Sequence, residues 1–153
     1  MTLSARDQCE KIEALDLSMV IRKMETLGWQ RAQAMRLARA YKNYLIIIAK
    51  YGAQYPHLPP SKEIDEFWHN HILDTQRYAK DCEAIFGRFL HHDPYVGFAG
   101  EDGAKGEGTA EDQGASAASS VAKNFATLQE LHKKEFGDYI YKIRKFSIFN
   151  YFK

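Results

Sequence analysis

The chain has 153 residues, of which 45% are hydrophobic, and its formal net charge is +1 at pH 7. This length favours one domain with a buried core, and the supply of apolar residues argues against intrinsic disorder. A net charge so close to zero excludes proteins that bind nucleic acids through bulk positive charge, so we expect no nucleic-acid partner.

The cysteine content and the apolar runs bear on the compartment. Two cysteines, Cys9 and Cys82, are too few for a disulfide framework. The first residues carry too few apolar side chains for an export signal, and no apolar run approaches the ~20 residues that cross a bilayer. We therefore expect a soluble, cytoplasmic protein with reduced thiols.

The N-terminal part of the chain predicts three helices. A short polar helix is expected over residues 5–14. A second helix follows over about 18–27, for which either Asp16 or Ser18 is a suitable N-cap. A third helix, over about 29–51, is expected because its apolar residues recur at helical spacing and a glycine follows them.

The middle of the chain predicts two further helices after a proline-rich loop at 54–60. Ser61 is a suitable N-cap for the first of them. Its apolar stripe falls at i, i+3, i+4, i+7 and i+8, and consists of Ile64, Phe67, Trp68, His71 and Ile72. Asp74 or Thr75 is expected to interrupt the helix and cap a second one, which ends at Gly87.

The C-terminal part contains two segments of unusual composition. Residues 99–120 are mostly Gly, Ala, Ser, Glu and Asp, which predicts a flexible surface loop. A last helix is expected over 121–136. The tail at 138–153 alternates aromatic and basic residues, and it would either pack on the core of the domain or dock on a partner protein or an anionic membrane. The sequence thus predicts an all-α protein, a single domain over 1–153 that is a compact bundle of about five or six helices with one long loop.

Potential metal ligands are concentrated between residues 65 and 93, a segment that contains four of the six histidines. Imidazole, carboxylate and thiolate groups are the usual protein ligands of transition metals. The candidate ligands are Asp65, His69, His71, Asp74, Cys82, His91 and His92. A set dominated by nitrogen and oxygen suits Zn, Fe or Cu better than Ca or Mg, so the segment predicts a site for one of these ions.

Helix geometry limits which of these side chains can meet. Successive helical residues turn by about 100°, so His69 and His71 point in directions about 200° apart, whereas Asp65 and His69 share a face. In one arrangement, Asp65 and His69 meet a ligand from the His91–His92 loop. In the other, His71 points inward to that loop and to Cys82, and His69 is exposed. A third interpretation is that the histidines are hydrogen-bonded core residues without a metal.

Two functions are compatible with these features. The first is a transition-metal-binding protein, such as a metal-dependent enzyme that activates water or oxygen for a small-molecule substrate. The second is a non-catalytic interaction or scaffold module, in which the His/Asp cluster is a structural hydrogen-bond network and the C-terminal tail docks on a partner or membrane. No phosphate-binding glycine loop, nucleophile elbow or Cys-x-x-Cys pair occurs in the sequence.

The same segment resembles the glycine-rich domain-containing protein-like family. The resemblance extends over about residues 15–137 and rests on the Trp68-His69-x-His71-Ile72-Leu73-Asp74-Thr75 run, on Tyr78, Asp81-Cys82 and Phe86-Gly87, and on His91-His92-x-Pro94-Tyr95. It implies a compact helical domain. It implies no particular reaction, and the chain lacks the glycine-rich regions of the plant members.

Overall fold

Six helices make up the regular structure of the computed structural model, which describes residues 3–94 and 110–145. In chain order they are α1 (Ala5–Glu13), α2 (Ser18–Thr26), α3 (Arg31–Tyr51), α4 (Lys62–Leu73), α5 (Thr75–Phe86) and α6 (Ala110–Phe136). Since no strand occurs in either described range, the predicted all-α class is confirmed. None of the helices in these ranges combines the length and apolar character needed to cross a membrane.

Local sequence explains the starts of two helices and the break between two others. The Ser4 hydroxyl accepts a hydrogen bond from the Asp7 amide at the start of α1, and the Ser61 hydroxyl accepts one from the Ile64 amide at the start of α4. The chain breaks between α4 and α5 at Asp74, whose ψ of 71° is not helical. Each of the two serine hydroxyls supplies an acceptor for an amide that has no partner within its helix.

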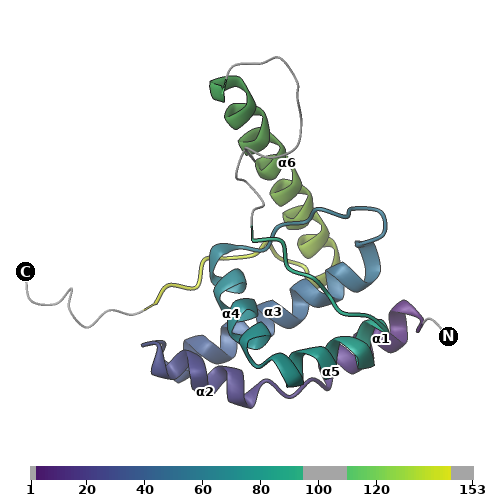
Figure 1. Ribbon diagram of the computed structural model, residues 1–153, viewed down its shortest axis with the longest axis vertical. Coiled ribbons are helices and arrows are strands. Elements are labelled where there is room, and N and C mark those ends of the chain that lie inside the picture. The colour runs from purple at the N-terminus through teal and green to yellow at the C-terminus, as the bar shows by residue number, and fades with distance from the viewer. Residues whose placement is uncertain (1–2, 95–109, 146–153) are drawn as a thin grey trace, which may run out of the picture.

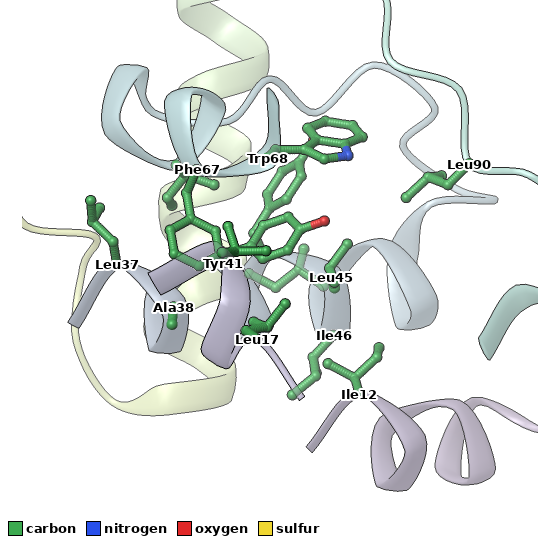
Figure 2. Packing of buried hydrophobic residues seen from close by; sticks show 14 of the residues in the cluster. Ile12, Leu17, Leu37, Ala38, Tyr41, Leu45, Ile46, Phe67, Trp68 and Leu90 are labelled. Atoms are coloured by element: carbon green, nitrogen blue, oxygen red, sulfur yellow. The ribbon is translucent and has the colours of Figure 1, made fainter. Parts of the chain in front are cut away.

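The long helix α3 lies at the centre of the arrangement and contacts α1, α2, α4 and α6 (Figure 1). Its Tyr41 packs against Phe67 of α4, with ring centroids 5.3 Å apart. Figure 2 shows the Tyr41 and Phe67 side chains between the two helices, with the Trp68 ring of α4 on the same side of the cluster. Full burial of a large side chain stabilises a fold by about 1.5–3 kcal/mol, so this layer between α3 and α4 fixes the position of α4.

The start of the last helix differs from the prediction. The helix begins at Ala110, so residues 110–120, predicted as part of the flexible loop, are helical. This stretch contains four alanines together with Glu, Asp and Gln, and alanine has the highest helix propensity of all residues. Residues 99–109 of the predicted loop lie outside the described residues. In Figure 1 the N-terminal part of α6 projects away from the other helices.

The tail returns across the other helices after Gly137 (Figure 1). The Gln129 side chain exchanges two hydrogen bonds with the backbone of Ile140, and the Gln33 side chain donates one to the Arg144 carbonyl oxygen. Ile143 is buried. Residues 138–145 therefore pack on the domain itself, while 146–153 lie outside the described residues.

Candidate metal centre

One turn of α4 places two potential ligands side by side. Asp65 lies in the first turn of the helix and His69 follows four residues later, so both project from one face. Asp65 Oδ2 lies 3.4 Å from His69 Nε2. The side chains are 34% and 48% exposed, so this pair is at the surface and open to solvent.

The third member, His92, comes from the segment that follows α5. Gly87 ends α5 in the left-handed conformation (φ 64°), which costs glycine little and lets the chain turn back beside α4. His92 Nε2 then lies 2.6 Å from Asp65 Oδ1 and 3.1 Å from His69 Nε2. Asp65, His69 and His92, which we call the His/Asp cluster, are the one group with metal-ligand spacing in the described part of the chain.

Two buried aromatic residues hold the His92 segment in place. The Tyr78 hydroxyl donates a hydrogen bond to the Leu90 carbonyl oxygen at 2.6 Å and accepts one from Trp68 Nε1 at 2.9 Å. The Trp68 ring also packs against the His92 ring, with centroids 4.4 Å apart and planes inclined by 62°. The position of His92 is therefore fixed both through the backbone two residues before it and through its own ring.

The contacts within the cluster depend on where the imidazole hydrogens lie. A neutral imidazole nitrogen either carries a hydrogen or offers a lone pair. Without an ion, both Nε2 atoms can carry a hydrogen and point it at separate oxygens of Asp65, and the 3.1 Å contact between the two nitrogens is then not a hydrogen bond. A cation among the three atoms would accept a lone pair from each of them at once.

The spacing of the three atoms also suits a metal ion. Ligand atoms about 2.0–2.1 Å from an ion are about 3.3 Å apart around a tetrahedral centre and about 2.9 Å apart at neighbouring octahedral positions. The distances within the cluster are 2.6, 3.1 and 3.4 Å. Two therefore fit closely as they stand, and Asp65 and His92 would separate by about 0.3–0.7 Å on binding.

His71 belongs to a separate network in the core. Its Nδ1 lies 2.9 Å from the Tyr41 hydroxyl and its Nε2 lies 3.0 Å from Asp81 Oδ2. The side chain is only 2% exposed, and burial lowers the pKa of His71 although Asp81 opposes that change. Both ring nitrogens thus have protein partners, and His71 does not join the His/Asp cluster.

The other predicted ligands lie apart from the cluster too. The exposed His91 ring packs against Phe89, and Asp74 pairs with Arg77 at 3.8 Å. Cys82 is buried in the core, where burial raises the pKa of its thiol, so it is a small core residue and not a ready thiolate ligand. We did not predict a role at the site for the hydrogen-bonded pair of Trp68 and Tyr78. The signal in the sequence is that both aromatic residues carry a polar group and lie on an apolar stripe, and such polar groups need hydrogen-bond partners when they are buried.

A family model described as UCP032817-like matches residues 14–109, which is more than half of the chain. No curated protein and no solved structure matches. The resemblance to the glycine-rich domain-containing family is therefore wrong, since nothing in the comparisons indicates that family. The motif residues that suggested it include the core residues Trp68, Tyr78 and Cys82, whose pattern reflects helix packing. The chain belongs to the UCP032817-like family.

Proposed function

We propose that this protein binds one transition-metal ion through Asp65, His69 and His92. The observation that carries the proposal is the convergence of two imidazole nitrogens and a carboxylate within 4.8 Å of one another. Two histidines and one carboxylate that leave coordination positions open are typical of non-haem Fe(II) sites, and three protein ligands plus water are typical of catalytic zinc. Fe(II) and Zn are therefore the leading candidates, with Cu the third.

An open site of this kind would support chemistry at the metal. Because only three protein ligands are available and Asp65 and His69 are partly exposed, water, oxygen or a substrate could reach the remaining positions. The ion would supply Lewis acidity or bind oxygen. The protein would orient the His92 ring against Trp68 and hold the carboxylate of Asp65 close to both imidazoles.

The alternative is a structural hydrogen-bond network in a non-catalytic scaffold module. It is favoured by the fact that all contacts within the cluster also lie within the range of hydrogen bonds or ion pairs. The tail contributes less to this alternative, because the buried Ile143 supports packing on the core for residues 138–145. For either function we propose a reducing, cytoplasmic setting, which the free thiols of Cys9 and Cys82 support.

Elemental analysis of protein purified without chelator tests the proposal. After loading with Zn(II), Cu(II) or, without oxygen, Fe(II), we expect about one ion per chain in the wild type. The variants Asp65→Asn, His69→Ala and His92→Ala should lose metal affinity by at least about 100-fold and keep their helical circular dichroism. His91→Ala is the matched control, since His91 neighbours His92 in sequence but lies outside the cluster.

The opposite result would favour the structural network. If no ion binds stoichiometrically and no metal raises the melting temperature of the wild type, the metal proposal is refuted. In that case the three cluster variants should still differ from His91→Ala, because they would lower the free energy of unfolding through lost hydrogen bonds, by about 0.5–1.5 kcal/mol each.

A further inference from the structure

A large groove opens beside the His/Asp cluster, and Asp65 and His92 form part of its wall. Its volume is about 960 Å³, at the upper end of the range of about 300–1,000 Å³ for small-molecule sites. Residues 52–60, the start of α4 and the segment after Gly87 surround it. A molecule in this groove would therefore lie against two of the three proposed metal ligands.

The groove is lined mainly by apolar and aromatic side chains. They come from α3, the 52–60 loop, α4, the end of α5 and the segment after Gly87, and include Tyr44, Ile48, Leu58, Trp68, Phe86 and Leu90. Four prolines also line it, and the fixed φ angles of the three in the 52–60 loop limit the freedom of that loop. Such a surface favours the apolar body of a ligand, through removal of that body from water.

The charged groups at the groove favour an anion near the cluster. Lys62 and Arg88 both line the groove, where they balance the carboxylates of Asp65 and Asp93. A divalent ion would add a charge of +2 to this balanced set, and the ion together with the Asp65 carboxylate and two neutral imidazoles would carry about +1 at that wall. With the ion bound, positive charge exceeds negative charge, and a carboxylate oxygen is a suitable further ligand for Fe(II) or Zn.

We infer that the groove binds a small organic carboxylate, whose apolar body lies along the aromatic wall and whose carboxylate completes the coordination of the metal. This inference rests on the proposed function, since the metal provides the attraction at one end. The ligand class follows from two separate properties of the groove, which are its apolar lining and its excess of positive charge once the metal is bound.

Three probes of graded chemistry test the ligand class by calorimetric titration of the zinc-loaded protein. The first is 4-phenylbutyrate, the second is 4-phenylbutan-1-ol, which keeps the body but lacks the carboxylate, and the third is acetate, which lacks the body. We expect 4-phenylbutyrate to bind at least about tenfold more tightly than either of the others, and about tenfold more tightly to zinc-loaded than to metal-free protein. Equal affinity for the acid and the alcohol would overturn the carboxylate assignment.

Charge variants locate the binding. Lys62→Ala and Arg88→Ala should each weaken binding of 4-phenylbutyrate by about two- to fivefold while zinc content stays unchanged. Lys80→Ala, which removes an exposed charge that does not line the groove, is the matched control and should have no effect. Equal effects of Lys62→Ala and Lys80→Ala would overturn the location.

The two proposals fail in different ways. If zinc binds stoichiometrically but 4-phenylbutyrate binds no better than acetate, the groove inference is wrong and the metal proposal stands. If no zinc binds, the metal proposal is wrong, and the groove inference falls with it because the attraction at the cluster is lost.

Discussion

Replacement of Tyr78 by phenylalanine isolates the contact that positions the His92 segment. The Tyr78 ring is fully buried and packs edge-on against both His71 and Phe89, at centroid distances of 4.9 and 5.2 Å. Phenylalanine keeps these ring contacts and removes only the hydroxyl. The change therefore tests the hydrogen bonds to Trp68 and Leu90 without opening a large cavity.

The expected loss follows from the two groups that the hydroxyl satisfies. Without it, the Trp68 N–H and the Leu90 carbonyl oxygen lose their partner, and each unsatisfied buried group costs about 1–3 kcal/mol. Both groups are buried, so we expect Tyr78→Phe to lower the free energy of unfolding by about 2–6 kcal/mol, which corresponds to a fall in Tm of roughly 4–24 °C.

Urea denaturation followed by circular dichroism measures the loss, and zinc titration of the same samples measures its effect on the cluster. Because the freed segment carries His92, zinc affinity should fall by about tenfold or more at temperatures where the variant is fully folded. Tyr139→Phe removes an exposed hydroxyl and should change stability by less than about 0.5 kcal/mol. A Tyr78→Phe protein as stable as Tyr139→Phe would refute this reasoning, and unchanged zinc affinity would show that the segment does not depend on this contact.

Two further predictions concern the C-terminal region. Ile143→Ala should lower the free energy of unfolding by about 2–4 kcal/mol in urea denaturation, because the Ile143 side chain is buried. Tyr141→Ala, which replaces an exposed side chain, should have little effect. Equal effects of the two changes would contradict the packing of the tail on the core. Hydrogen bonds from Lys50 and Tyr51 lower the pKa of Glu135, so its stabilising contribution is present above its ordinary pKa of 4.5 and is lost as the pH falls through the lowered value. Between pH 5 and about 3, the Tm of Glu135→Gln should therefore fall less than the Tm of the wild type. An equal fall in the two proteins would contradict this prediction.

The helical fold was accessible from sequence because its signals are local. Ser61 and Gly87 mark the predicted ends of helices, and the break at Asp74 appears where the sequence predicts it. The start of α6 was not accessible, because the polar, alanine-rich stretch before residue 121 lacks an apolar stripe and has the composition of a loop. Alanine and small polar residues occur both in helices and in flexible loops, so the local pattern does not distinguish a helix from a loop in such a stretch.

The candidate site was accessible only in part. The i, i+4 relation of Asp65 and His69 on α4 follows from helical periodicity alone. The choice of His92 instead of His91 does not, because residues 88–94 have no regular period and their direction depends on the contact of Tyr78 with Leu90. Likewise, the sequence left open whether His71 pointed to the loop, and its partners Tyr41 and Asp81 come from helices on either side of it.

The two hydrogen bonds of the His71 imidazole restrict how α3, α4 and α5 can pack against one another. One ring nitrogen requires the hydroxyl from α3 and the other requires the carboxylate from α5. A slip of α4 by a single residue would rotate it by about 100° and leave both nitrogens without partners in a dry interior. The apolar stripe of α4 determines which face of the helix packs inward, and the two hydrogen bonds of this ring add a directional requirement to the same alignment.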